Sequence, residues 1–236
     1  MFLQEESIIF TLIERAQFKR NQPVYVPGEI PVPSAPDGCR PSLLEWLLRE
    51  TENVHGRIRR YTSPDEHPFY PDEVPELVLP PLRYPEVLRD TANVNINGKL
   101  LDTYINRVVP QITPEGDDSN YGSAAMYDVH CLQALSKRVH YGKFVAEAKF
   151  QARPDDYSKL IQARNQDAIM ALLTDEVQER RVVDRVCRKA AQYGQDNTEG
   201  QAVYKVQPAV VGQLYADWVM PLTKEVQLQY LMARLD

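Results

Sequence analysis

The chain has 236 residues, a formal net charge of −6 and a pI near 5.4. That length suffices for one sizeable hydrophobic core, and the acidic balance disfavours nucleic acids and anionic membranes, both of which repel an acidic surface. No apolar run approaches the roughly 20 residues needed to cross a bilayer. The sequence therefore predicts a single domain over residues 1–236 that binds neither nucleic acid nor membrane.

The chemistry-bearing residue types show no familiar metal, phosphate or nucleophile pattern. Cys39, Cys131 and Cys187 are dispersed and odd in number, which is typical of free thiols in a reducing compartment. The four histidines form no pair at metal-ligand spacing. Gly-rich phosphate loops, GxSxG elbows and Cys/His nucleophile signatures are missing as well. We therefore expect chemistry that uses no metal, no cofactor and no covalent intermediate.

The first residues lack the usual targeting patterns. They contain no basic segment followed by an apolar core, and no Arg- and Ser-rich transit character. We expect a cytoplasmic protein, with the plastid as the alternative if a transit peptide has been lost.

Helical periodicity recurs along the chain, whereas period-2 strand patterns are scarce, which predicts an all-α fold. Ser42 and Glu45 stand at capping-box spacing, so a helix should begin there. The proline-rich stretches 21–41 and 62–86 predict irregular surface loops. The expected helices span about 3–20, 43–61, 97–109, 132–150, 157–164, 166–173, 175–193, 208–218 and 221–235.

The expected helix over 132–150 carries two cations beside its apolar side. Arg138 and Lys149 are about three turns apart, so they project from nearly the same side. Two cations facing inward would cost several kcal/mol each unless anions meet them. Two interpretations follow. The cations form structural ion pairs with acidic side chains, the commoner arrangement in an arbitrary helix, or they line a pocket for a small molecule with carboxylates.

Two other helices also place polar pairs on apolar stripes. Asp175 and Glu179 are four residues apart, and they are either first-turn acids favoured by the helix dipole or part of a pocket. Thr223 and Gln227 have the same spacing, which is more often a satisfied buried polar pair than a site. If the three helices pack together, their polar pairs would suit an acidic, hydroxylated ligand.

Three long motifs carry a family resemblance: SKRVHYGKFVAEAKF, with RIRRYTSPDEHPFYPD upstream and MPLTKEVQLQYLMARLD at the C-terminal end. In these motifs the chain resembles the eukaryotic all-helical chorismate mutases of the plant and yeast types, and the resemblance runs from Glu5 onward. It implies an all-α protomer, a homodimer, and rearrangement of chorismate to prephenate on the way to phenylalanine and tyrosine.

The resemblance implies six catalytic residues: Arg138, Lys149, Asp175, Glu179, Thr223 and Gln227. Arg138 matches the arginine that clamps a substrate carboxylate, and Lys149 the lysine that donates to the ether oxygen and a carboxylate. Glu179 matches the glutamate that receives the ring hydroxyl. Asp175 stands at the same wall of the expected pocket, where yeast-type enzymes have asparagine. Thr223 matches a carboxylate ligand, and Gln227 a donor to the ether oxygen.

This set suits the expected reaction. A Claisen rearrangement is pericyclic, so the enzyme must hold the reactive conformer and stabilise negative charge on the breaking ether oxygen. The substrate's carboxylates would then meet the inward cations, and the ion-pair interpretation loses most of its weight.

One family residue has no counterpart in this chain. The family has another carboxylate-binding arginine about two and a half turns upstream of Ser7, which would precede Met1. Either the sequence is truncated there or this form is a weakened relative. Two functions stay open: an active, regulated chorismate mutase, or a non-catalytic relative that keeps the fold for binding or dimerisation.

The resemblance also implies a site between protomers for aromatic amino acid effectors, namely Trp, Tyr or Phe. The matching residues are Arg59, Arg60, Asn120, Gly122 and Ser123, the last three in a regulatory-type loop over 114–123. Gly122 fits a place where a ligand packs close to the backbone. Met126 stands where yeast-type enzymes have an effector-contacting threonine, which leaves the effector's identity open. The alternative is a basic helix end that is solvated or paired with the helix dipole.

Overall fold

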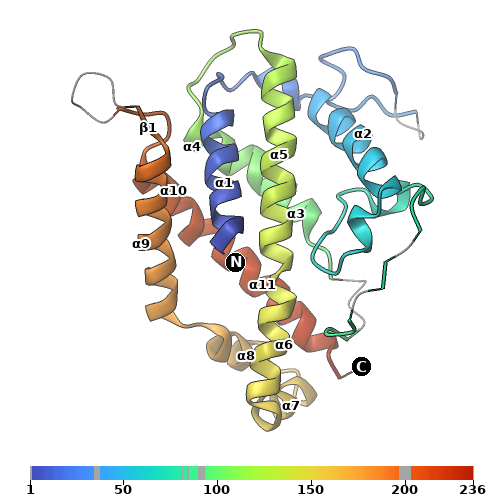
Figure 1. Ribbon diagram of the computed structural model, residues 1–236, viewed down its shortest axis with the longest axis vertical. Coiled ribbons are helices and arrows are strands. Elements are labelled where there is room, and N and C mark those ends of the chain that lie inside the picture. Colours follow the sequence, from blue (N-terminus) through green and yellow to red (C-terminus); the bar gives the residue numbers. More distant parts are fainter. Residues whose placement is uncertain are drawn as a thin grey trace.

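The computed structural model describes residues 2–34, 38–80, 82–83, 85–89, 94–196 and 203–235 (Figure 1). Helices dominate these residues, which confirms the predicted all-α class. The α-helices are α1 (Phe2–Arg15), α2 (Leu43–Arg57), α3 (Asn97–Thr103), α4 (Val109–Ile112), α5 (Tyr121–His140), α6 (Gly142–Ala152), α7 (Pro154–Gln162), α8 (Gln166–Leu173), α9 (Glu176–Tyr193), α10 (Pro208–Leu214) and α11 (Met220–Ala233). Strands β1 (Gln195–Asp196) and β2 (Val203–Tyr204) form an antiparallel pair.

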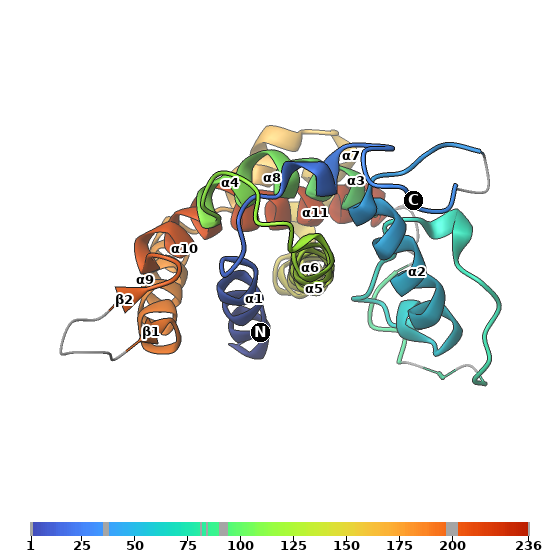
Figure 2. The same cartoon turned by 90° about the horizontal axis from the view of Figure 1, so that it is seen from above.

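Helices α5 and α6 run end to end through the middle of the molecule (Figure 1). Helix α1 packs along α5, α9 packs against α10, and α11 packs against α6; α2 also contacts α5. Seen from above, α3, α4 and α11 lie to one side of α1 and α5 (Figure 2). None of the described helices is long and apolar enough to span a membrane.

The hydrophobic core has two parts. The larger cluster includes Ile9 of α1, Leu44 of α2, Leu132 of α5 and Val226 of α11, all fully buried. The smaller cluster joins α6, α7, α8 and α11. Helix α11 contributes to both clusters, so it holds the helices of the larger cluster in place relative to α6, α7 and α8.

The predicted capping box at the start of α2 is confirmed. The backbone N–H of Glu45 donates to Ser42 Oγ at 3.2 Å, and the backbone N–H of Ser42 donates to a Glu45 carboxylate oxygen at 2.8 Å. The helix ends earlier than predicted, at Arg57, because the chain turns into the left-handed region at Arg59, where φ is 74°. The predicted helix over 3–20 likewise ends early, at Arg15, whereas 166–173 matches α8.

The prediction of one helix over 132–150 is wrong. Helix α5 begins at Tyr121, ends at His140, and meets α6 at a turn on Tyr141. At the start of α6, a Cβ on Gly142 would lie 2.8 Å from the backbone oxygen of Thr223. Only glycine allows α6 and α11 to approach this closely, so Gly142 serves packing rather than being merely tolerated.

Two π-helical stretches were not predicted, and each stands just before a proline. Tyr104–Val108 precedes Pro110, and Tyr215–Val219 precedes Pro221. In each, the backbone N–H that follows donates five residues back, from Val109 to Tyr104 and from Met220 to Tyr215. Proline lacks an N–H and clashes with the carbonyl four residues earlier, which favours this wider turn.

A buried ion pair ties α1 to α5. Arg15 Nε donates to Asp128 Oδ1 at 2.7 Å, and both side chains are fully buried. Tyr25 and Tyr104 each donate their hydroxyl to Asp128 at 2.8 Å. The remaining Arg15 donors bind Tyr25 Oη and the backbone oxygens of residues 18–20, at 2.9 to 3.3 Å. The cluster is fully hydrogen-bonded, so it is structural.

Candidate active site

The six predicted catalytic residues converge on one cavity of about 150 Å³ between α5, α6, α9 and α11. Arg138 comes from the last turn of α5, Lys149 from α6, and the other four from α9 and α11 with the residue before α9. Apolar side chains complete the walls: Val145, Leu173, Val182 and Met220. A polar set from four separate chain segments therefore lies in a partly apolar enclosure.

Arg138 is buried, with 6% of its surface exposed, yet it makes no ion pair with any residue that the structure describes. Its Nη1 donates to Thr223 Oγ1 at 3.4 Å, and within the described residues its Nε has no hydrogen-bond partner. Burial lowers the pKa of this guanidinium, partly opposed by Tyr215 and Glu5. The ion-pair interpretation therefore fails for Arg138, whose open donors suit an anionic ligand.

Lys149 is half-buried and donates to the backbone oxygen of Leu173 at 2.6 Å. Burial lowers its pKa, while the carboxylates of Asp175 and Glu179 act in the opposite direction. The ammonium has two further N–H donors, so a second acceptor in the cavity can bind it while Leu173 holds it in place.

The two carboxylates at the start of α9 differ in their contacts. Asp175 is exposed and caps the helix by accepting from the backbone N–H of Gln178 at 3.0 Å, as the first-turn alternative predicts. Glu179 is less exposed and forms an ion pair with Lys224 at 2.9 Å. Both side chains line the cavity, so the capping role of Asp175 does not remove it from the wall.

On α11, Thr223 and Gln227 are buried, and their hydrogen bonding is incomplete. Thr223 Oγ1 donates to the backbone oxygen of Val219 at 2.6 Å, and Gln227 Nε2 donates to the backbone oxygen of Thr223 at 3.3 Å. Gln227 Oε1 finds no partner in the part of the chain that the structure describes. Thr223 and Gln227 therefore do not form the fully hydrogen-bonded buried pair that is the commoner reason for this spacing.

Comparisons with known proteins agree with this site. Residues 120–228 match the family described as chorismate mutase type II. The chain is 50% identical over 240 residues to the chloroplastic chorismate mutase 1 of Petunia hybrida, covering 99% of this chain and 73% of that protein. The chain belongs to the chorismate mutase family. The non-catalytic alternative is not favoured, because curated relatives at this identity are named as chorismate mutases, which are isomerases.

Solved structures of the family share the fold. A structure of AtCM1 with tyrosine bound in its allosteric site matches with a TM-score of 0.91 at 50% identity, covering 100% of this chain and 93% of that one. The Aro7p chorismate mutase from Candida albicans, in complex with L-Trp, matches with a TM-score of 0.93 at 40% identity, covering 98% and 88%.

Lys224 is a cavity residue that the sequence interpretation missed. Its ammonium pairs with Glu179, and it stands next to Thr223 in α11. A lysine beside a buried threonine is typical of a solvated helix face, and nothing local in the sequence signals that its side chain reaches α9. No cluster of three or more His, Cys, Asp or Glu side chains suited to a metal occurs among the described residues.

The five residues expected at the effector site do not meet within this protomer. Arg60 lies near the C-terminal end of α5, where Glu66 bridges it to Lys137. Asn120 is the residue just before the other end of α5, and Gly122 and Ser123 belong to the first turn of that helix rather than to a loop. About 22 Å separates Gly122 from Lys137 along the helix, at 1.5 Å per residue.

The two arginines of this set make different contacts. Arg59 donates to the backbone oxygen of Pro80 at 2.8 Å, while Arg60 forms an ion pair with Glu66 at 3.0 Å. A Cβ at Gly122 would meet nothing within 4 Å among the residues that the structure describes.

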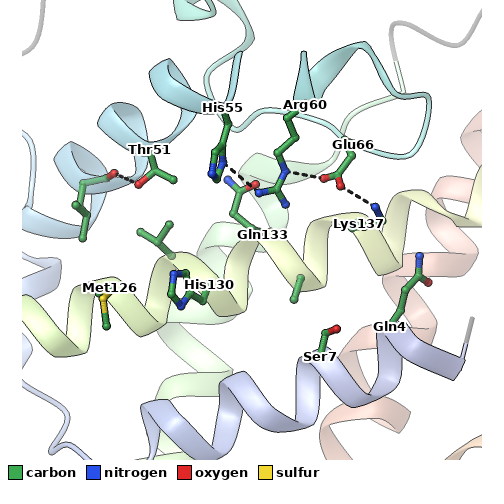
Figure 3. Close-up of a pocket in the computed structure, with 13 residues that line it drawn as sticks. Gln4, Ser7, Thr51, His55, Arg60, Glu66, Met126, His130, Gln133 and Lys137 are labelled. Carbon is green, nitrogen blue, oxygen red and sulfur yellow. Dashed lines mark hydrogen bonds and ion pairs between the residues drawn. The ribbon is translucent and has the colours of Figure 1, made fainter. Parts of the chain in front are cut away.

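A larger cavity of about 750 Å³ runs between α1, α2 and α5 (Figure 3). We call it the α5 groove. It is lined on α5 by Met126, Val129, His130, Gln133, Ala134 and Lys137, and Arg60 and Glu66 close one end. Met126 is 41% exposed, so an apolar side chain of α5 stands open on this face.

Proposed function

We propose that this enzyme rearranges chorismate to prephenate in the cavity between α5, α6, α9 and α11, a step toward phenylalanine and tyrosine. One observation carries the proposal: six polar residues from separate segments converge on a single cavity in a member of the chorismate mutase family. The reaction needs a held conformer and a stabilised ether oxygen rather than an acid, base or nucleophile.

Arg138 is proposed to clamp a substrate carboxylate. Its Nε and the remaining donors of its planar fork suit bidentate recognition of that group. Thr223, 3.4 Å from Nη1, provides a hydroxyl at the same place. Because burial penalises the unpaired guanidinium, binding an anion removes a cost that the free protein carries.

Lys149 and Gln227 are proposed to donate to the breaking ether oxygen. Each has one N–H bound to a backbone oxygen and at least one further N–H available. The backbone bonds hold the two donors before substrate arrives, which is the condition for electrostatic stabilisation without reorganisation. Glu179 is proposed to receive the ring hydroxyl, with Lys224 holding its carboxylate.

A steady-state assay tests the reaction, with chorismate loss and prephenate formation followed together. The purified protein should convert chorismate, and K159A, at an exposed lysine of α7 that does not line the cavity, should retain wild-type kcat. Wild-type protein that folds but produces no prephenate would refute the proposed reaction.

We also propose that the enzyme is a homodimer in which α5 packs antiparallel to the α5 of its partner. The Asn120–Ser123 turn and Arg60 lie at opposite ends of α5. An antiparallel two-fold arrangement would therefore bring the Asn120–Ser123 turn of one protomer to the Arg60 end of its partner's groove. Two-fold interfaces are self-complementary, and the α5 groove provides a long, partly apolar surface for the partner's helix.

Sedimentation equilibrium at micromolar concentration tests the dimer. M126E should shift the protein toward monomer, because it places a charge in the apolar stretch of the groove. V177E is the matched control on the exposed face of α9, where Val177 is 52% exposed, and should leave the mass unchanged. A purely monomeric wild-type protein would refute the dimer.

We propose aromatic amino acids as effectors of this enzyme. Three related structures support this, with tyrosine or phenylalanine in the allosteric site of AtCM1 and L-Trp in complex with the Candida albicans enzyme. Activity measured with each of the three amino acids identifies the activator and the inhibitor.

For the compartment, we propose the cytoplasm, with the plastid as the alternative because relatives include forms named chloroplastic. Fractionation of the source cells distinguishes the two compartments.

A further inference from the structure

Glu66 divides one carboxylate between two cations from different parts of the chain. One oxygen, Oε2, accepts from Arg60 Nε at 3.0 Å, and the other, Oε1, accepts from Lys137 Nζ at 2.7 Å (Figure 3). The Glu66 side chain is only 12% exposed, against 25% for Arg60 and 38% for Lys137. Partial burial and two charge-assisted bonds make this bridge stronger than a surface ion pair.

The bridge ends on the turn of α5 that serves the active site. Lys137 directly precedes Arg138, so the two share one helical turn while their side chains point about 100° apart. The backbone oxygen of Lys137 also accepts the N–H of Tyr141 at 3.0 Å, the bond that joins α5 to the turn before α6. A change in the electrostatic attraction between Glu66 and Lys137 therefore acts on the segment that positions Arg138 relative to Lys149.

We infer that Glu66 is a positioning residue that couples an effector bound at Arg60 to the setting of Arg138 in the active site. The inference rests on the proposed effector site and assigns a residue to its regulation. Glu66 is not among the residues that line the cavity with Arg138, and its bond to the expected effector site is the one to Arg60.

The physical step is competition for Arg60. His55 Nδ1 lies 3.1 Å from Arg60 Nη1 on one side, and Glu66 binds Nε on the other. The guanidinium has further N–H donors on its Nη atoms, and an effector carboxylate that binds them competes with Glu66 for the charge of Arg60. The Glu66 carboxylate then shifts its interaction toward Lys137. The bridge thus has two arrangements. In one, Glu66 binds both Arg60 and Lys137; in the other, it binds mainly Lys137, and a ligand shifts the populations of the two.

Asp65 provides a matched control. Its carboxylate lies 3.4 Å from Lys137 Nζ, and Arg60 is bonded to Glu66 and His55. Removing the Asp65 charge therefore alters the surroundings of Lys137 without breaking the link to Arg60.

The test compares wild-type protein with E66Q, K137M and D65N. Binding of L-tyrosine, L-phenylalanine and L-tryptophan is measured by calorimetry, and kcat and KM for chorismate are measured with and without each amino acid. In wild type, the most effective amino acid should change kcat/KM at least about fivefold, the lower end of usual allosteric coupling. In E66Q and K137M the amino acid should still bind, and its effect should fall below about twofold.

D65N should keep the wild-type response. E66Q or K137M that binds the amino acid and responds as wild type does would overturn the inference, as would loss of response in D65N alone. E66Q changes the centre of the bridge and K137M its end on α5, so a folding defect in one variant, detected by circular dichroism, leaves the other decisive. Wild-type protein that binds none of the three amino acids would overturn the effector site itself and the inference with it.

Discussion

Arg15 and Arg138 are both buried arginines of helices that pack together, with 0% and 6% of their surface exposed, but their surroundings differ. Arg15 faces the carboxylate of Asp128 at 2.7 Å and uses its other donors on Tyr25 and backbone oxygens. Arg138 has a single 3.4 Å bond to the hydroxyl of Thr223 and an Nε without a partner among the described residues.

The difference also appears in the pKa values. The partners of Arg15 raise its pKa against the opposing effect of burial, whereas burial lowers the pKa of Arg138. A buried cation with every donor satisfied holds the fold together. A buried cation with open donors weakens the free protein and gains its partner when an anion binds.

Exchanging each arginine for methionine tests this contrast directly. R138M should lower kcat/KM by about 10²- to 10⁴-fold, because it removes two charge-assisted bonds worth roughly 1.5–3 kcal/mol each. Its free energy of unfolding should stay the same or rise. R15M should lower the free energy of unfolding by about 3–5 kcal/mol, because Asp128 is left buried without its cation.

Urea unfolding and steady-state kinetics on both variants provide the check. The contrast breaks down if R138M destabilises the protein as much as R15M does, since Arg138 would then be a structural residue like Arg15.

Lys149→Ala sharpens the comparison within the cavity. The variant should lower kcat at least about a hundredfold, on the scale of a lost oxyanion donor, since Lys149 is proposed to act on the ether oxygen. K159A is the control and should behave as wild type. An unchanged kcat with a raised KM would show instead that Lys149 only binds a carboxylate, as Arg138 does.

The sequence could predict the local features of this contrast but not the long-range ones. The capping box of Ser42 and Glu45 depends on residues three apart, so pattern alone located it. Arg138 and Lys149 stood out because their spacing turned them toward an apolar side, and the family motifs linked them to α9 and α11. The Arg15–Asp128 pair spans 113 residues, and no local pattern connects its members.

Packing details were also outside the reach of local patterns. The close approach of α6 to α11 at Gly142 is a property of the pair of helices rather than of either one. The π-helical stretches are an exception, because each is followed by a proline, Pro110 or Pro221, that favours the wider turn. The reach of Lys224 to Glu179 depends on the placement of two helices, which the spacing within α11 does not reveal.

A third buried cluster is intermediate between the surroundings of Arg15 and Arg138. Its cation, Lys143, is hydrogen-bonded but forms no ion pair with a carboxylate of the described residues. Lys143 Nζ lies 2.5 Å from His67 Nε2, and the His67 ring packs on His140 with centroids 4.4 Å apart. Burial, together with the neighbouring charges, lowers the pKa of His67 to about 3 and of His140 to about 4. Both rings are therefore neutral in the folded protein near pH 7.

This cluster predicts acid sensitivity. Between about pH 6.5 and pH 4 the unfolded chain binds more protons than the folded one at these two histidines, so stability falls as pH falls through that window. We expect a loss of about 2–3 kcal/mol between pH 6.5 and pH 5, measured by urea unfolding at each pH. The variant H67Q/H140Q should show a flatter profile; an identical slope would assign the effect to other groups.

Gly142→Ala tests the close approach that positions α11. The added Cβ would lie 2.8 Å from the backbone oxygen of Thr223, so the helices must separate at a cost of about 1–3 kcal/mol. KM should rise as well, because Thr223 and Gln227 move with α11. G98A, at a glycine of α3 where a Cβ meets no described atom within 4 Å, should leave both quantities near wild type.

Calorimetric titration with prephenate, the dicarboxylate product, tests most directly whether the open donors of Arg138 exist for a ligand's carboxylate. Wild-type protein should bind prephenate at one site per protomer, and R138M should bind it at least about tenfold more weakly, the equivalent of 1.4 kcal/mol. Equal affinity in the two proteins, at equal helicity, would contradict the account.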